Sequence, residues 1–275
     1  MLRKITAVFT ALCVLFTITA CRPTNSVDET TPTTHPYELL PFTPVTSTQQ
    51  YFESMSYYDD IVETTIHYLF HKPLRDTGEA APLVIFLHGR GDAVSEDYPG
   101  TATQFVESLM HLENQSYVYG AYTMVPITPF SYEGNWSGFQ IWAFKQLIPK
   151  LIEQYHIDPK RVYISGISMG GFMTCQLVSG MPPDTFAAAV PLSGARKISS
   201  PELRHNTAFR IYHVATDPVV SVSSSQALYQ ELVEANHPAV EYIEYESGNH
   251  ISPLYTVFVE DRDAFFAWLF NQRLP

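Results

Sequence analysis

A serine near the middle of the chain lies in a pattern that suits a nucleophile. Ser168 is the central residue of a Gly-x-Ser-x-Gly pattern that runs from Gly166 to Gly170. The β-branched segment 162–165 before it predicts a strand, and the apolar segment 169–179 after it predicts a helix. A serine on such a sharp strand-to-helix turn exposes its hydroxyl beside helix amides that favour developing negative charge. The context therefore predicts a nucleophile elbow rather than a chance match.

A serine hydroxyl needs a base to take its proton, and His250 is the best placed histidine. It directly follows the predicted strand 240–245, so it lies at the carboxyl edge of the sheet, where the serine turn also opens. His237 precedes that strand and belongs to the opposite edge. His205 comes before the expected acid, and His213 lies within a strand, where we expect it to be packed and satisfied.

The acid that orients this base is expected between the serine and the histidine in the chain. Asp217 follows the predicted strand 209–215 and would accept a hydrogen bond from the imidazole. A purely structural turn aspartate before Pro218 is the alternative. Glu244 lies inside a strand, and Glu246 is too close to the histidine along the chain, so both are weaker candidates.

The third requirement is a pair of amides that stabilise an oxyanion. The buried strand predicted at 83–87 is followed by His88-Gly89-Arg90, which suits a loop that offers one amide. We expect the amides of Arg90 and Met169 to form this oxyanion hole, and His88 to hold the loop. The loop lacks the Gly-x-x-x-x-Gly-Lys pattern of a phosphate-binding loop.

Trp136 is a candidate for substrate binding. It follows the strand predicted at 121–125, and an indole there could stack on an aromatic acyl group or a sugar. A tryptophan packed on the surface of the domain is an equally good interpretation.

Strands alternate with helices along the chain from about residue 51 to residue 275, which predicts one α/β domain with a parallel sheet. Only about fifteen residues separate the strands that end near Leu192 and begin near Phe209, which leaves no room for a large cap. The expected strands are 61–70, 83–87, 121–125, 162–165, 186–192, 209–215 and 240–245, and the expected helices are 140–155, 169–179, 223–235 and 262–271.

The N-terminal segment has the features of an export signal. Residues 1–20 combine Arg3 and Lys4 with a short apolar run, and the small residues before Cys21 resemble a bacterial lipobox. We expect cleavage before Cys21, a lipid on its sulfur, and a Thr/Pro/Ser-rich tether over 21–50. An ordinary secretory signal is the alternative. Either prediction places the mature protein outside the cytoplasm.

Composition excludes several other classes. The formal net charge is −12 and we find no basic patch with interleaved aromatic residues, so nucleic acid is not an expected partner. Apart from Cys13 and Cys21 in the N-terminal segment, Cys175 is the only cysteine, so no intrachain disulfide is expected in the domain. The sequence has no recognisable metal-ligand cluster, and we expect no cofactor.

Together these stretches resemble the α/β-hydrolase superfamily, and more narrowly its secreted serine esterases of the feruloyl esterase, polyhydroxybutyrate depolymerase and predicted-peptidase type. The likeness rests on the segments around Leu87-His88-Gly89, Asp158-Pro159-Lys160-Arg161-Val162-Tyr163 and Gly166-Ile167-Ser168-Met169-Gly170-Gly171, and on the Asp217 and His250 segments. The resemblance implies hydrolysis of acyl esters, of carbohydrates or aromatic acids, through an acyl-enzyme. A serine peptidase or amidase is the alternative enzyme, and a non-catalytic surface binding lipoprotein is the alternative from another class.

Overall fold

The structure is a computed structural model that describes residues 52–73, 78–90, 120–128, 136 and 138–275. All of these residues lie in one compact unit of the chain, Leu39–Pro275. The predicted signal, Cys21 and the tether lie outside the described residues.

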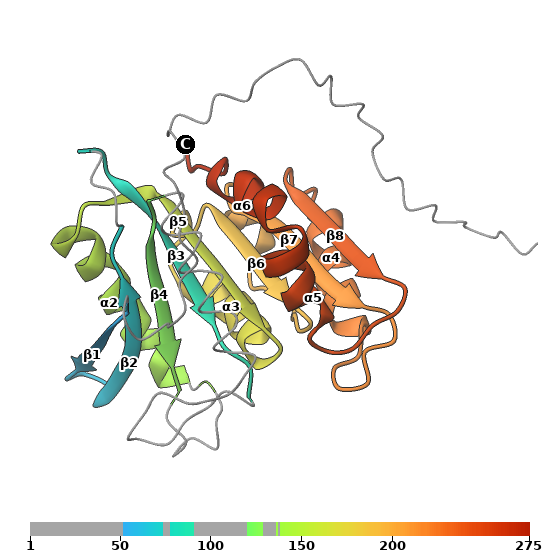
Figure 1. Cartoon of the computed structure of the whole chain (residues 1–275), viewed down its shortest axis with the longest axis horizontal. Coiled ribbons are helices and arrows are strands. Elements are labelled where there is room, and N and C mark those ends of the chain that lie inside the picture. The colour runs from blue at the N-terminus through green and yellow to red at the C-terminus, as the bar shows by residue number, and fades with distance from the viewer. Residues whose placement is uncertain (1–51, 74–77, 91–119, 129–135, 137) are drawn as a thin grey trace, which may run out of the picture. The chain divides into compact units, whose positions relative to one another are not determined.

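Eight strands form a single sheet in the order β1-β2-β4-β3-β5-β6-β7-β8 (Figure 1). The two antiparallel pairs are β1–β2 and β2–β4, and all other neighbours are parallel. The mostly parallel sheet predicted from the sequence is therefore confirmed. Its strands are β1 Glu53–Asp59, β2 Thr64–His71, β3 Ala81–Leu87, β4 Tyr122–Ile127, β5 Ile157–Ile167, β6 Ala188–Leu192, β7 Ala208–Val214 and β8 Val240–Tyr245.

The first strand differs from its prediction, because 61–70 is not one strand. Residues 60–63 form the turn of a hairpin that joins β1 to β2. Asp59 explains the turn, since its Oδ1 accepts hydrogen bonds from the amides of Ile61 and Val62 at 3.0 and 3.1 Å. A side chain that caps its own backbone in this way favours a turn over a continuing strand.

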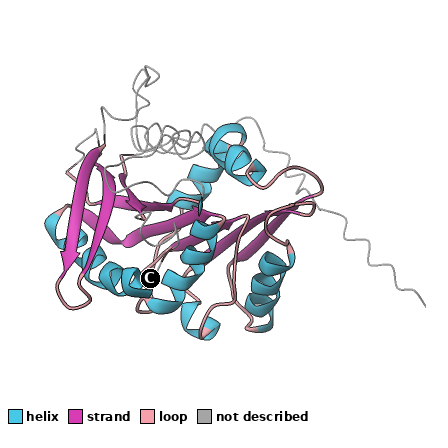
Figure 2. Cartoon of the chain, turned by 90° about the horizontal axis from the view of Figure 1, so that it is seen from below, coloured by secondary structure: helices cyan, strands magenta, loops and turns pink. Residues whose placement is uncertain are grey.

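Helices flank both faces of the sheet (Figure 2). Residues of α2, α3 and α4 share one buried apolar cluster with alternate strand residues such as Ile85 and Ile164. Residues of α5, η5 and α6 share a second cluster with the intervening strand residues, such as Phe86 and Tyr163. Both faces of the central strands are therefore buried, which explains their continuous apolar sequences. The helices are α2 Gly138–Gln154, α3 Met169–Gly180, α4 Ser223–Glu234, α5 Ser252–Tyr255, the π-helical η5 Thr256–Glu260 and α6 Arg262–Phe270.

The connection between β6 and β7 is short, as expected. It contains only the 3-10 turn η4, Pro201–Arg204, so no cap is inserted at this point. The α5–η5 segment, which follows β8, was not predicted. Within the described ranges, no helix is long and apolar enough to cross a membrane.

Candidate active site

Ser168 lies on the tight turn between β5 and α3, at the place predicted for a nucleophile. Its backbone angles are φ 57° and ψ −116°, a sparsely populated conformation for a residue with a side chain. Its amide donates to the carbonyl of Leu192 at the end of β6 (2.8 Å), and its carbonyl accepts from the amide of Phe172 in α3 (3.0 Å). These bonds hold a turn that costs about 1–3 kcal/mol of backbone strain.

Close backbone packing around this turn depends on Gly166 and Gly170. A Cβ on Gly166 would lie 2.5 Å from the carbonyl oxygen of Gly170, and a Cβ on Gly170 would overlap the carbonyl of Leu87. The first turn of α3 therefore lies directly against the end of β3 and the loop that follows it. This contact brings the histidine-glycine loop next to the serine.

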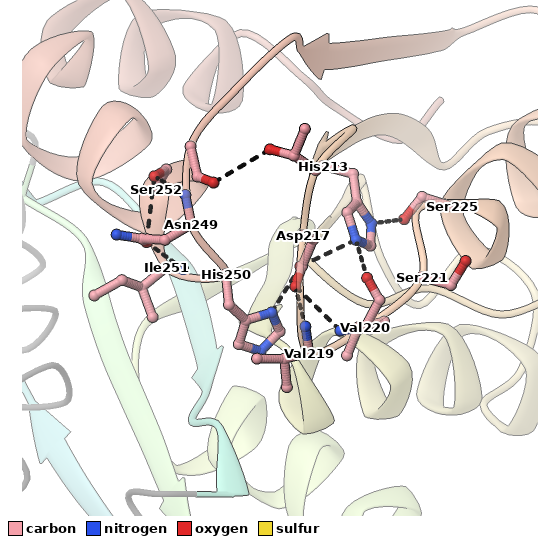
Figure 3. A network of polar contacts seen from close by, with 12 residues as sticks. His213, Asp217, Val219, Val220, Ser221, Ser225, Asn249, His250, Ile251 and Ser252 are labelled. Atoms are coloured by element: carbon pink, nitrogen blue, oxygen red, sulfur yellow. Dashed lines mark hydrogen bonds and ion pairs between the residues drawn. The ribbon is translucent and has the colours of Figure 1, made fainter.

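Asp217 and His250 meet at the carboxyl ends of β7 and β8 (Figure 3). His250 Nδ1 donates to Asp217 Oδ2 at 2.7 Å, and the Asp217 side chain is fully buried. Because this bond places a proton on Nδ1, Nε2 of the neutral ring has a free lone pair, and it points away from Asp217. The imidazole therefore has the tautomer and orientation of a general base.

Hydrogen bonds keep the Asp217 carboxylate ionised. Burial alone raises its pKa, but the hydrogen bond from His250 and those from the amides of Val219 and Val220 have a larger combined effect. The net result is a pKa below the usual value for aspartate. Both amides donate to Oδ1, at 2.8 and 3.1 Å, in a turn closed by Pro218. Asp217 thus makes the local turn contacts of a structural aspartate and also binds the imidazole.

The loop that carries His250 is fixed by its neighbours. Asn249 Oδ1 accepts from the amide of Ile251 at 3.0 Å, and the Ser252 hydroxyl accepts from the amide of Asn249 at 2.9 Å. Helix α5 begins at Ser252, so the histidine is held between the end of β8 and the start of a helix.

A second histidine, His213 of β7, also contacts Asp217. Its Nε2 lies 3.2 Å from Asp217 Oδ2 and 3.1 Å from the carbonyl of Val220, and its Nδ1 lies 2.7 Å from the hydroxyl of Ser225. The prediction that this histidine is buried and satisfied is correct, yet its contact with the acid was missed. The available signal was the position of His213 near the end of β7, four residues before Asp217 in the chain.

Ser168 lies at the same edge of the sheet as the Asp217–His250 pair. Ser168 follows β5 and Asp217 follows β7, and these two strands are both hydrogen-bonded to β6, which lies between them. Among the described residues, Ser168 and His250 are not hydrogen-bonded to each other. Such bonds are often long in enzymes without substrate and shorten in the reacting complex.

The amides of Met169 and Arg90 remain the predicted oxyanion hole. Met169 is the first residue of α3, so its amide has no carbonyl partner within the helix. Arg90 is exposed and follows β3, in the loop that the Gly170 contact brings next to the elbow.

His88 is a structural residue of that loop, as predicted. Its ring is buried, its Nδ1 donates to the carbonyl of Gly89 at 2.7 Å, and its Nε2 accepts from the amide of Thr128 at 3.1 Å. Burial lowers the pKa of His88 to about 4, although the Gly89 contact opposes this shift. The ring is therefore neutral and ties the loop to the end of β4.

Other candidates from the sequence lie in less suitable surroundings. Trp136 is half-buried and packs against His88 and Phe144, with ring centroids 5.2 and 6.3 Å apart, so it contributes to the core. Its contact with substrate remains a prediction. His237 is buried, donates to the carbonyl of Arg204 at 2.9 Å and lies beyond the end of α4. Glu244 is exposed, and its carboxylate accepts a hydrogen bond from the side chain of Gln226 in α4.

This combination of sheet order, flanking helices and serine elbow defines the α/β-hydrolase fold. The chain has this fold, without a cap between β6 and β7. A sequence model described as the prolyl oligopeptidase family matches residues 134–200, which include the elbow.

Individual relatives are esterases and depolymerases. Poly(3-hydroxyalkanoate) depolymerase C of Paucimonas lemoignei is 40% identical over 52 residues, which cover 19% of this chain and 12% of that protein. A bifunctional acetylxylan esterase/xylanase of Neocallimastix patriciarum is 28% identical over 92 residues, 34% of this chain and 14% of its own length. A solved structure described as a thermostable esterase is 27% identical to this chain and superposes with a TM-score of 0.71. The match covers 82% of this chain and 64% of the esterase chain. The chain thus spans less than two thirds of each of these relatives.

Proposed function

We propose that the protein is a serine carboxylesterase that hydrolyses acyl esters through an acyl-enzyme. The observation that carries this proposal is the Asp217–His250 hydrogen bond at the same sheet edge as the strained turn of Ser168. The named activities of the relatives, a depolymerase of polyesters and an esterase of acetylxylan, support ester substrates. Esters of carbohydrates or aromatic acids are the proposed substrate class.

In the proposed mechanism, Ser168 Oγ attacks the acyl carbon while His250 Nε2 takes its proton. The amides of Met169 and Arg90 donate to the oxyanion of the tetrahedral intermediate. As the C–O bond to the leaving group breaks, the imidazolium returns its proton to the departing oxygen. Water then attacks the acyl-enzyme by the same route and releases the acid. Asp217 orients the imidazole and stabilises its protonated form.

The test compares hydrolysis of p-nitrophenyl acetate and methyl ferulate by the wild-type protein and its Ser168→Ala variant. We expect turnover by the wild type and loss of at least about 10³-fold in the variant. Equal rates for the two proteins would contradict the assignment of the nucleophile. Labelling by a fluorophosphonate, mapped to Ser168, separates an active hydrolase from a non-catalytic binding protein.

A serine peptidase is the second candidate, because the matched family model is that of the prolyl oligopeptidases. Amide hydrolysis would require His250 to protonate an amine leaving group. Peptidyl p-nitroanilides, assayed beside the esters, distinguish the two. If kcat/KM is higher for the anilides than for the esters, the protein is a peptidase and the esterase assignment is wrong.

The same proposal places the protein outside the cytoplasm, anchored to a bacterial membrane through a lipid on Cys21. Its support is the apolar run and small residues before that cysteine. Metabolic labelling with a radioactive fatty acid tests it, and we expect label on the wild type and none on a Cys21→Ala variant. Equal labelling of both proteins would contradict the anchor.

A further inference from the structure

The carboxylate of Asp217 binds two histidines through a single oxygen. Oδ2 lies 2.7 Å from His250 Nδ1 and 3.2 Å from His213 Nε2, whereas Oδ1 accepts the amides of Val219 and Val220 (Figure 3). An ionised carboxylate offers about four acceptor positions, and here each has a donor next to it. Contacts to both oxygens therefore fix the orientation of the Asp217 carboxylate.

The neighbours of His213 show which ring nitrogen carries a hydrogen toward Asp217. Its Nε2 faces only acceptors, the carbonyl of Val220 and the Asp217 carboxylate, so Nε2 bears a hydrogen. On its other side, Nδ1 lies 2.7 Å from the hydroxyl of Ser225, a buried residue of α4. A hydroxyl can donate or accept a hydrogen bond, so Ser225 can hold the ring in this orientation.

We propose that His213 is a positioning residue, which holds the Asp217 carboxylate so that its Oδ2 stays directed at His250. The contacts run from Ser225 in α4 to His213 in β7, from His213 Nε2 to Asp217 Oδ2 at 3.2 Å, and from Asp217 to His250 after β8. Both His213 and Asp217 have side chains with no solvent exposure, so water cannot replace a lost donor. This inference rests on the proposed hydrolase function, because the orientation of His250 has value only if it serves as a base.

Removal of the imidazole should affect the chemical step more than substrate binding. In a His213→Leu variant, Oδ2 loses its contact with Nε2 of the imidazole and the carboxylate can rotate toward the space left by the ring. A displacement of about 1 Å in a catalytic group lowers rates by roughly 10²-fold. We expect kcat for p-nitrophenyl acetate to fall by at least about 10-fold, with KM within a factor of about two.

Conservative variants test the role of the donor itself. The amide nitrogen of glutamine can occupy the place of Nε2, so His213→Gln should recover most of the lost kcat. Ser225→Ala should lower kcat less than His213→Leu, and add no further loss in the double variant, because it acts only through His213.

His237→Leu is the matched control. His237 is likewise buried and bonded at both ring nitrogens, to the carbonyl of Arg204 and the amide of Ala239, but it has no contact with Asp217. Both leucine variants should lower thermal stability. Only His213→Leu should lower kcat and the rate of Ser168 labelling by a fluorophosphonate.

A spectroscopic measurement separates this inference from the proposed function. The proton in the bond between His250 Nδ1 and Asp217 gives a far-downfield ¹H NMR resonance, which requires no turnover. We expect this resonance to shift or broaden in His213→Leu and to be unchanged in His237→Leu. If the wild type hydrolyses no ester and is not labelled, the hydrolase proposal fails while this measurement still tests His213.

An unchanged resonance in folded His213→Leu, or a kcat within two-fold of wild type, would overturn the positioning role. If His213→Leu does not fold, Ser225→Ala decides it: an unchanged resonance together with an unchanged kcat would overturn the positioning role.

Discussion

At the scale of single residues, the site depends on a buried charge that is kept ionised. Asp217 has no solvent around its side chain, and burial by itself disfavours the charged form. The carboxylate stays ionised because two amides and the His250 imidazole donate to it. In the proposed mechanism, the hydrogen bond between this carboxylate and His250 also fixes the tautomer of the imidazole.

An Asp217→Asn variant should therefore lose activity without losing its fold. The amide nitrogen of asparagine would face Nδ1 as a donor, and this favours the wrong tautomer of His250. We expect kcat to fall by about 10³- to 10⁴-fold. Ester hydrolysis measures the loss, and circular dichroism checks the fold. Near-wild-type turnover would show that another group orients the imidazole.

Buried neutral histidines should make stability depend on pH. The pKa of His88 is lowered to about 4 by burial, from an ordinary value near 6.5. Above about pH 6.5 neither the folded nor the unfolded chain binds a proton at this residue. Between about pH 6.5 and 4 only the unfolded chain does, so acid favours unfolding by up to about 3 kcal/mol.

Urea denaturation between pH 7 and pH 4 measures this effect. The free energy of unfolding of the wild type should decrease with falling pH, and the decrease should be smaller in a His88→Asn variant, whose amide group can still donate to Gly89. If the free energy of unfolding falls equally with pH in both proteins, His88 does not contribute to the pH dependence of stability.

At the scale of elements, the catalytic edge depends on how closely α3 approaches β3. Gly170 at the start of α3 lies against the carbonyls of Leu87 and His88, so the helix and the histidine-glycine loop meet without side chains between them. The elbow and the loop are consequently held as one unit.

A Gly170→Ala variant should disturb both stability and activity. The new methyl group would overlap backbone atoms that cannot move aside easily, and overpacking of this kind costs typically 1–3 kcal/mol. Gly138→Ala in α2 is the matched control, because no described atom outside its own helical turn and chain neighbours lies within 4 Å of the position of its Cβ. Thermal melting and ester hydrolysis compare the two variants. Equal melting temperatures would contradict the close approach.

At the scale of the whole molecule, the residues proposed for hydrolysis lie at one edge of the sheet, and no metal site is evident among the described residues. In those parts of the chain, no group of three or more His, Cys, Asp or Glu side chains is placed to hold a metal ion. The polar groups that meet at the sheet edge are instead engaged with one another, as Asp217 and His250 are.

If Ser168 is the nucleophile of the proposed mechanism, ester hydrolysis should be insensitive to chelators. We expect the rate to stay within about 20% of its initial value after dialysis against EDTA, because the proposed chemistry uses only protein groups. Activity that is lost on dialysis and restored by Zn²⁺ would require a metal in the mechanism.

Much of the architecture and most of the site residues could be predicted from the sequence. Ser168 directly follows β5, and Asp217 and His250 lie in the loops after β7 and β8. Because the strands of a parallel sheet end at one edge, local patterns were sufficient to bring the three residues to that edge. The strand-to-helix context of the serine and the alternation of elements are also local features. Such patterns are visible because hydrophobic periodicity depends on neighbours along the chain.

What only the tertiary structure decided is which distant side chains touch. The hairpin at 60–63, the helix after β8 and the contact of His213 with Asp217 were not predicted. The approach of His250 to Asp217, 33 residues apart in the chain, likewise depends on strand order and on the loops after β7 and β8. These distances follow from the packing of the whole sheet and its helices, because no residue type by itself specifies its partner across the fold.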